Sequence, residues 1–427
     1  MVGLLVVALA FIPHSFPLFK AGGWSLIDFL VPVFAAWYVI KAIIQNRLDS
    51  DLRPLSILPF IFLLLTVLHV FTDPRLEEIF RSFTSYRLPV GGFRIYYSIV
   101  ICITLYYLTP LVINNLEALY RFLRIYFFIV VAQIVICIGR IVFRIHTLPW
   151  DTYSSQVIQY EEISSYWGGG IRLILLGNMG LFLFTYAITL LKGTSKVKVA
   201  LIIVAFLALV MSGGRATLFA ALFIACLFIA AKFRKWFVAA MTGLFVVSVV
   251  AIFSLMPSLL DSFPTMPKRY LSILSPSNPS FQSDEYSRME MWKGQFYNLK
   301  HHPLWGSVND LPPHMDDRAK KAVIGGDTHN VYLGIASRFG IVTFTIWLLF
   351  ISRQIRRSYS MIRNSPKSTK IHSLSLWLFL SLSAYLLLYL TGGGVGGGYA
   401  DAYIIFSLID IVHRLSYEEK SDVCAVE

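Results

Sequence analysis

The chain has 427 residues, of which 56% are hydrophobic and 14% charged, whereas an ordinary soluble domain has roughly 45–50% and about 25%. This composition excludes a soluble globular protein and indicates a polytopic membrane protein. The formal net charge of +13 does not indicate nucleic-acid binding, because the basic residues separate apolar segments instead of forming one basic stripe. The four cysteines are too scattered for a disulfide framework or a zinc site.

Apolar runs of about 20 residues predict an all-α membrane protein with about twelve transmembrane helices. These runs lie near residues 2–19, 24–44, 54–72, 95–115, 119–143, 171–191, 197–212, 216–231, 236–256, 329–352, 373–391 and 399–414. No small-residue cleavage site follows the first run, so we expect it to be a retained span.

The positions of Lys and Arg predict the orientation and the domain organisation. One set of alternate short loops holds about twice as many of these cations as the other, which places both termini in the cytoplasm. The expected parts are nine spans over 1–256, a large outer loop over 257–328, three spans over 329–414 and a cytoplasmic tail over 415–427. This unequal division argues against a transporter built from two repeats.

The outer loop is the one sizeable segment predicted outside the membrane, and it holds eight of the 18 prolines. Between these prolines, the spacing predicts one helix from Asp284 to Lys300. Its apolar residues recur at helical spacing and can rest on the membrane or on the bundle: Met289, Trp292, Phe296 and Leu299. His301 and His302 are expected to cap the end of this helix. A second amphipathic stretch, 76–86, is expected in the outer interface.

A candidate general base stands at the start of the tenth predicted span, in Asp327-Thr328-His329-Asn330. Asp327 or Thr328 can cap the helix, which would place His329 in its first turn. The positive end of the helix dipole disfavours imidazolium there, so we expect a neutral histidine that can accept a proton. The alternative is an interfacial histidine that hydrogen-bonds to lipid headgroups.

Two arginines are predicted on the same side of the membrane as His329. Arg215 follows two glycines in the turn between the seventh and eighth spans, where it either pairs with an anion or snorkels to the surface. Arg288 lies on the predicted loop helix, where the alternative role is a salt bridge with Asp284. A base and two guanidinium groups suit a reaction in which a hydroxyl attacks and a diphosphate leaves.

Three further polar or glycine-rich segments are interpreted as ordinary loops, and we predict no metal site and no cofactor. Asp49-Ser50-Asp51 falls on the predicted cytoplasmic side, away from His329, and 392–398 is interpreted as a flexible glycine turn. An acidic cluster in the outer loop matches no metal-binding spacing. It consists of Asp310, His314, Asp316 and Asp317.

Together these features resemble the O-antigen ligase and polymerase superfamily of bacterial envelope glycosyltransferases. The resemblance rests on the twelve-span layout and on three motifs. They are Ser-Gly-Gly-Arg-Ala-Thr at 212–217, the run Arg288…Trp292…His302-Pro303-Leu304-Trp305-Gly306, and Asp327-Thr328-His329-Asn330 followed by Gly340. One departure is Arg338, because many members carry an acidic residue two positions before this glycine.

The resemblance implies a GT-C-like helical fold in the bacterial inner membrane and an active site facing the periplasm. It implies a metal-independent, inverting transfer of glycan from undecaprenyl diphosphate, with lipid A core as the acceptor and membrane lipids as surroundings. By motif position, His329 would be the base on the acceptor hydroxyl, and Arg215 and Arg288 would hold the diphosphate. The supporting residues would be Asp327, Asn330 and Trp292.

Within this superfamily, a ligase and a polymerase remain alternatives. The turn 215–218 and the single large loop before the tenth span favour the ligase. A transporter or flippase of polyprenyl-linked glycan is the alternative from another class. It would need polar residues inside several spans, and the candidates are scattered in the sequence: Asp28, His69, Gln133 and Asn178. A non-catalytic scaffold is the last alternative.

Overall fold

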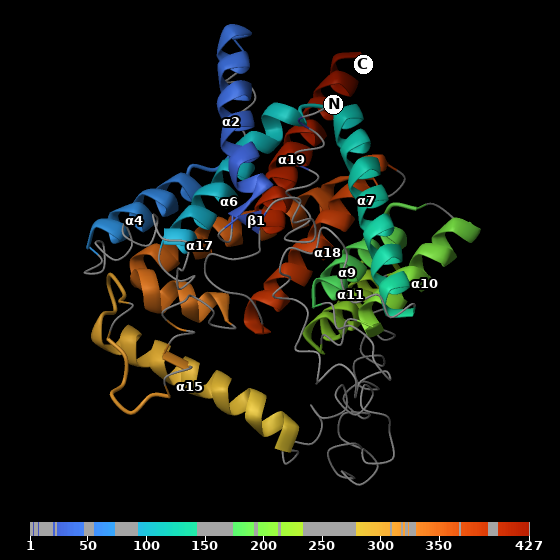
Figure 1. The fold of residues 1–427 in the computed structure, drawn as a ribbon. Helices are drawn as coiled ribbons and strands as arrows, with labels where there is room; N and C mark the ends of the chain where they lie inside the picture. Colours follow the sequence, from blue (N-terminus) through green and yellow to red (C-terminus); the bar gives the residue numbers. More distant parts are fainter. Residues whose placement is uncertain are drawn as a thin grey trace. The chain divides into compact units, whose positions relative to one another are not determined.

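A computed structural model of the chain shows a predominantly helical protein (Figure 1). It describes residues 3, 7, 20–21, 24–46, 55–72, 93–142, 174–191, 195–211, 215–233, 279–307, 310–316, 319–320, 323, 330–366, 369–391 and 400–426. The predicted segments 2–19 and 236–256 therefore lie almost entirely outside the described residues, as do 76–86, 49–51 and 392–398.

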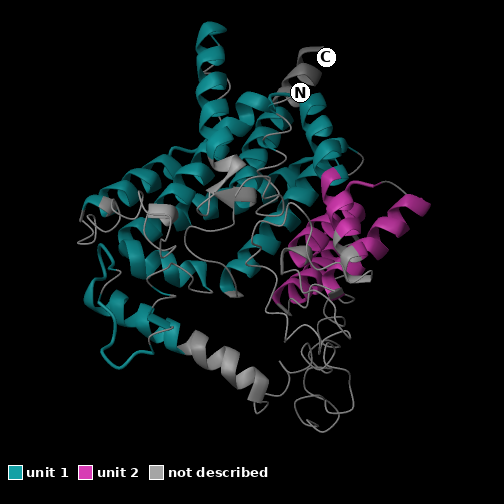
Figure 2. Cartoon of the chain, viewed as in Figure 1, with its two compact units in different colours: residues 1–128, 290–427 teal, residues 129–289 magenta. Residues whose placement is uncertain are grey.

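The chain divides into two compact units (Figure 2), with residues 1–128 and 290–427 in the first and 129–289 in the second. The first unit contains the helices α2 (Leu26–Ile44), α4 (Leu58–Thr72), α6 (Phe93–Val112), α17 (Val331–Asn364), α18 (Lys370–Thr391) and α19 (Ala400–Val426). The second contains α9 (Ile174–Thr189), α10 (Lys196–Met211) and α11 (Arg215–Phe233). Two helices have residues in both units, α7 (Leu116–Val142) and α15 (Pro279–His301).

Ten of the twelve predicted apolar segments coincide with a helix, and these are the ten that fall on described residues. Three helical segments in the described part of the chain are both long and apolar enough to cross a membrane. They are Leu116–Ile136, Val331–Asn364 and Lys370–Leu390. Shorter apolar helices lie at Phe29–Ile44, Leu58–His69, Tyr96–Val112 and Ala216–Ala231. The protein is thus a helical membrane protein, while the number of its spans stays a prediction.

The all-helical class is confirmed, and the structure refines three details of this layout. A short antiparallel ladder pairs β1 (Lys20–Ala21) with β2 (Trp24–Ser25), two residues in each strand, before the first described long helix. The tenth predicted segment does not end at residue 352, because α17 continues to Asn364 and carries several cations that the sequence placed in a loop. The last helix, α19, continues to Val426, through most of the expected tail.

Contacts within the first unit agree with helices that alternate in direction. At one end, Arg414 of α19 donates to the carbonyl oxygen of Asn114, which precedes α7, at 2.9 Å. At the other end, Nδ1 of His69 in α4 lies 3.1 Å from the hydroxyl of Tyr96 in α6. The first contact joins segments predicted in the cytoplasm, and the second joins the predicted outer ends of two helices.

A buried carboxylate connects three helices at the predicted cytoplasmic end. Asp410 of α19 is fully buried and accepts hydrogen bonds from Tyr106 of α6 and from Gln354 and Arg357 of α17. The Tyr106 hydroxyl in turn accepts from the backbone N–H of Ser56, just before α4, at 2.8 Å. Because a charge inside a low-dielectric bundle is costly unless it is paired, this network fixes the relative positions of the helices.

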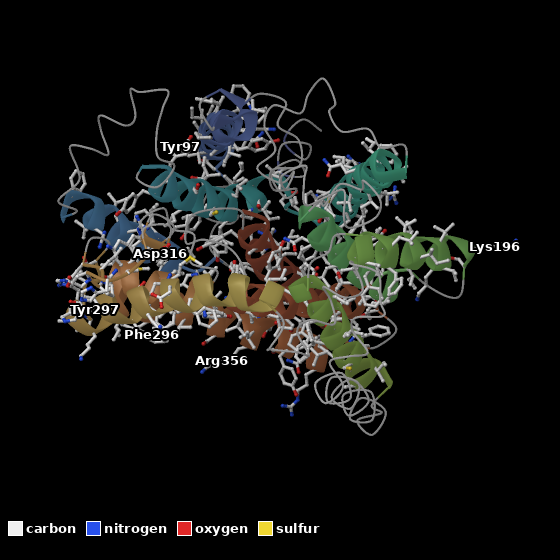
Figure 3. The ribbon with its side chains drawn as sticks, turned by 60° about the horizontal axis from the view of Figure 1, so that its bottom comes forward. Tyr97, Lys196, Phe296, Tyr297, Asp316 and Arg356 are labelled. Atoms are coloured by element: carbon white, nitrogen blue, oxygen red, sulfur yellow. The ribbon has the colours of Figure 1, made fainter. Side chains whose placement is uncertain are left out.

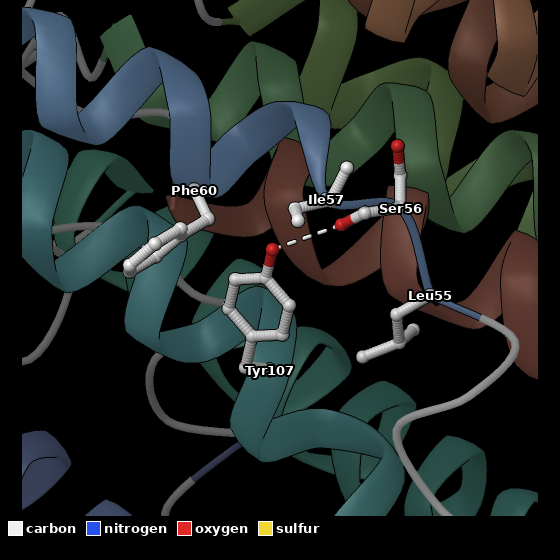
Figure 4. A pocket seen from close by; sticks show the side chains of 5 residues that line it. All are labelled: Leu55, Ser56, Ile57, Phe60 and Tyr107. Atoms are coloured by element: carbon white, nitrogen blue, oxygen red, sulfur yellow. Dashed lines mark hydrogen bonds between the residues drawn. The ribbon is translucent and has the colours of Figure 1, made fainter.

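The same network borders a small apolar pocket of about 330 Å³ (Figure 4). The pocket is lined by Leu55, Ser56, Ile57, Phe60 and Tyr107. The Tyr107 hydroxyl donates to the Ser56 carbonyl at 2.8 Å, so the segment before α4 is bound through both its N–H and its C=O groups. These bonds hold the start of α4 against α6.

The Asp410 network predicts a large effect of one substitution. Asp410→Ala leaves the Arg357 guanidinium without its carboxylate, and breaking a buried pair in this way costs about 3–5 kcal/mol. We expect a clearly lower thermal unfolding midpoint in detergent. The matched control is Glu117→Ala, which removes an exposed pair with Arg121 and should change the midpoint little. Equal effects of the two substitutions would contradict the role given to Asp410.

Candidate functional site

The start of α17 differs from the sequence-based expectation. Asn330 is the N-cap of this helix, with extended backbone angles, and its side chain accepts a hydrogen bond from the Leu333 N–H at 3.0 Å. The prediction that Asp327 or Thr328 caps the helix is wrong, since the first helical residue is Val331. The first turn of the helix therefore does not include His329. Asn330 has the structural role that short polar side chains fill at this position.

Within α17 the helix is interrupted at Gly340, where the backbone has φ 79° and ψ 170°. In a continuous helix the Ile341 N–H would donate to the carbonyl of Ser337. Instead it donates to the carbonyl of Pro303 at 2.8 Å, and the Ser337 carbonyl accepts from the N–H of Ser307 at 3.0 Å. The turn 303–307 of the outer loop is thus inserted into the hydrogen-bond ladder of α17.

Two glycines make this close approach possible. A Cβ atom on Gly340 would lie 2.0 Å from the carbonyl oxygen of Leu304, and one on Gly306 would lie 2.4 Å from the backbone of Arg338. Both glycines also have positive φ, which other residues rarely adopt. Both positions belong to the motifs that carry the family resemblance, so the structure gives a physical reason for glycine at each of them.

The turn follows directly from the end of α15. The prediction that His301 caps this helix is confirmed, since its Nδ1 lies 2.9 Å from the carbonyl oxygen of Tyr297. His302 instead has its Nε2 atom 3.0 Å from Oδ2 of Asp310. The amide of Asn298 donates to the Ser307 carbonyl at 3.1 Å, so the helix and the turn form one hydrogen-bonded structure.

The buried face of α15 is not the apolar face that the sequence suggested. Phe296 is largely exposed (Figure 3), while Met291, Gln295 and Asn298 are buried. Neither amide atom of Gln295 has a hydrogen-bond partner among the described residues. The buried side of the helix is therefore partly polar. The helical spacing of seven residues puts Gln295 on the same face as Arg288.

A small hydrophobic cluster holds α15 on the rest of the outer loop. Met291 packs with Met315, and the other members are Leu311, Ala319 and Val323. The side chain of Met315 also fills the space beside Gly294, where a Cβ would lie 2.8 Å from its sulfur. The cluster gives the outer loop a hydrophobic core of its own, which the sequence of this proline-rich loop did not indicate.

A second cluster lies next to the kink, on three helices. Phe339 packs edge-on against His69 of α4 at 5.4 Å and against Tyr96 of α6 at 6.0 Å between ring centres. The guanidinium carbon of Arg338 lies 5.9 Å from the centre of the Tyr96 ring, and this arginine is only 4% exposed. His69 and Arg338 were noted separately in the sequence, and the fold brings them together.

The three principal residues predicted from the sequence are only partly placed. Arg215 is the first residue of α11, and Arg288 lies in the first half of α15, but the side chains of both are outside the described residues. His329 and Asp327 lie outside them entirely. Among the supporting residues, Asn330 caps α17 and Trp292 is half-buried on α15. The proximity of the three principal residues remains a prediction.

The acidic residues of the outer loop have local structural roles in the described segments. Asp316 accepts from the backbone N–H of Ala319 at 3.2 Å, and Asp310 pairs with His302. Over the described ranges, no group of three His, Cys, Asp or Glu residues could hold a metal ion. Asp317 lies outside the described residues.

The turn 303–307 is inserted into a helix that is long and apolar enough to cross a membrane. Residues 200–348, which are less than half of the chain, match the family model described as O-antigen ligase. This region is therefore similar to the O-antigen ligase superfamily, as the motifs predicted. The matched region includes most of α10, all of α11 and α15, and the first half of α17. Comparison with curated proteins gives no match.

The contact between the turn and the kink predicts the effect of one methyl group. Gly340→Ala forces a residue with a Cβ into a conformation that costs about 1–3 kcal/mol and adds an overlap with the Leu304 carbonyl. We expect a lower unfolding midpoint and faster hydrogen exchange at the amides of Ser307 and Ile341. In the control Gly139→Ala, the added Cβ meets no atom within 4 Å, so the midpoint should be unchanged or higher. Slow exchange at both amides in Gly340→Ala would refute the coupling.

Proposed function

We propose that the protein is an O-antigen ligase-type glycosyltransferase of the bacterial inner membrane. It transfers a glycan from undecaprenyl diphosphate to a hydroxyl group of lipid A core at the periplasmic face. The observation that carries this proposal is the family match over 200–348, because this region includes Arg215, Arg288 and His329. The match supports the class of enzyme, and the residue types support the reaction.

The proposed reaction is a direct displacement at the anomeric carbon. The acceptor oxygen forms the new bond to this carbon while the bond from the carbon to the diphosphate oxygen breaks. His329 takes the proton from the acceptor hydroxyl, and undecaprenyl diphosphate leaves with the electron pair. One displacement inverts the configuration of the sugar, and no step requires a metal ion.

Two arginines are assigned to the leaving group. Arg215 begins α11, and the guanidinium group of an arginine can bind two phosphate oxygens at once and stays charged at every relevant pH. Arg288 is placed on α15, the helix that the cluster around Met291 and the bonds to the turn hold in position. Their charges stabilise the negative charge that develops on the diphosphate.

Three residues are assigned supporting roles around the base. Asn330 follows His329 directly and is fixed by its hydrogen bond to Leu333, so it limits the freedom of the chain next to the base. Trp292 lies one helical turn after Arg288 and offers an apolar surface to a sugar ring. Asp327 is the nearest carboxylate in the sequence that could orient the imidazole.

A reconstituted assay separates this proposal from its two alternatives. Purified protein in liposomes is given undecaprenyl-diphosphate glycan, with and without lipid A core, in a buffer that contains EDTA. We expect a shifted core band on a gel only when lipid A core is present. A ladder that forms on undecaprenyl diphosphate alone would instead identify a polymerase. Movement of a headgroup label across the membrane without transfer would identify a transporter or flippase.

The assignment of His329 predicts a specific loss of activity. His329→Ala should lower transfer by about 10²–10⁴-fold, which is the usual contribution of a general base, with an unchanged unfolding midpoint. The matched control is His301→Ala, since His301 is exposed and its described contacts are the carbonyl and the ring of Tyr297 in its own helix. His301→Ala should keep near-normal transfer, and near-normal transfer by His329→Ala would remove it from the catalytic role.

A further inference from the structure

The turn inserted into α17 presents two large apolar side chains to the surroundings. Leu304 is 60% exposed and Trp305 is 59% exposed, while five other apolar residues of the outer loop form the small cluster around Met291. Three backbone groups of the turn are hydrogen-bonded: the Pro303 carbonyl and the Ser307 N–H bond to α17, and the Gly306 N–H bonds to the His302 carbonyl. These bonds lower the cost of bringing the turn into an apolar medium.

The length of α17 shows that only part of it lies in the membrane. Its 34 residues extend over roughly 51 Å, against about 30 Å for the hydrocarbon layer of a bilayer. Before the kink, the residues from Gly334 to Phe339 are all buried within the protein. Directly after it, Ile341 and Val342 are exposed, 45% and 39%. The exposed surface of α17 therefore begins at Ile341, directly after the kink.

From this point the exposed apolar side chains continue along the helix. They include Leu349, and the first charged residue after the kink is Arg353, roughly 18 Å from Ile341 along the axis. The hydrocarbon layer is about 30 Å thick, so Gly340 and the turn bonded to it fall within the depth of this layer when it is counted outward from Arg353. The Leu304–Trp305 pair lies at the outer end of the exposed surface.

We propose that the turn 303–306 lies in the outer leaflet of the membrane, with Leu304 and Trp305 in contact with lipid acyl chains. The argument is continuity, because this pair extends the lipid-facing surface of a helix that is apolar enough to span a membrane. The adjacent His302 and its partner Asp310 keep the chain on either side of the turn polar. The occupant of this surface is bulk membrane lipid.

This placement means that the lipid-exposed surface of α17 begins near Ile341 and that the turn 303–306 continues it, while Gly334–Phe339 are covered by protein. The turn thereby anchors the outer loop to the bilayer. The inference concerns the membrane boundary and holds for any reaction that the protein catalyses.

Quenching of tryptophan fluorescence by brominated lipid tests the proposal. The protein is reconstituted into phosphatidylcholine liposomes with dibromo acyl chains, and the quenched emission of the parent chain is compared with that of Trp305→Phe. We expect Trp305→Phe to lose part of the lipid-quenched emission and none of the emission quenched by iodide. Trp37→Phe, at a 63% exposed position on α2, is the positive control, and Trp377→Phe, fully buried in α18, is the negative control.

Each other outcome overturns the proposal. If Trp305 contributes to iodide-quenched emission, the turn lies in water. If it contributes to neither quenched fraction, protein covers it. Since Trp305→Phe keeps an aromatic ring, misfolding is not expected, and equal unfolding midpoints of the variant and the parent chain establish this directly. A loss of transfer activity in the same samples would not affect the conclusion, because the quenching measurement does not depend on catalysis.

Discussion

The exchange of hydrogen bonds at Gly340 determines the arrangement of the first unit on its predicted outer side. A helix that lacks one of its own bonds in a membrane must satisfy both groups elsewhere, since lipid offers no partner. Here the Ile341 N–H and the Ser337 carbonyl are both satisfied by the turn 303–307. The loop that carries α15 and the helix that carries Asn330 are therefore parts of one structure, although about thirty residues separate them in the chain.

Different kinds of interaction stabilise the two ends of the first unit. On the predicted cytoplasmic side, the charge of Asp410 is paired inside the bundle, so the helices are fixed by electrostatic attraction in a medium of low dielectric constant. On the outer side, two glycines allow backbone atoms to touch, so the contact depends on shape and on neutral hydrogen bonds. The first arrangement tolerates no loss of charge, and the second tolerates no added atom.

Much of the helical fold could be predicted from hydrophobicity alone. The ten apolar segments on described residues are helices, because a run of apolar residues long enough for a membrane has few other stable conformations.

The end of α17 could not be predicted in the same way. From the sequence alone, Arg357 resembles a cation in a cytoplasmic loop, and only the fold shows that its partner Asp410, 53 residues later, lies beside it. The family resemblance and the glycine motifs could be recognised from the sequence. The close backbone contacts that require glycine at 306 and 340 could not. The N-cap was predicted wrongly because three polar residues within four positions, Asp327, Thr328 and Asn330, are all suitable caps.

The insertion of the turn also makes the segment 308–336 a closed loop. Its two ends are fixed against each other by the Ser307–Ser337 hydrogen bond, and each doubling of the length of a flexible loop adds only about 0.6 kcal/mol to the cost of closing it. Met315, Ala319 and Val323 pack against α15, so changes of length are tolerated best between Val323 and the N-cap residue Asn330. Such changes alter the surface of the loop and leave α15 and α17 in place.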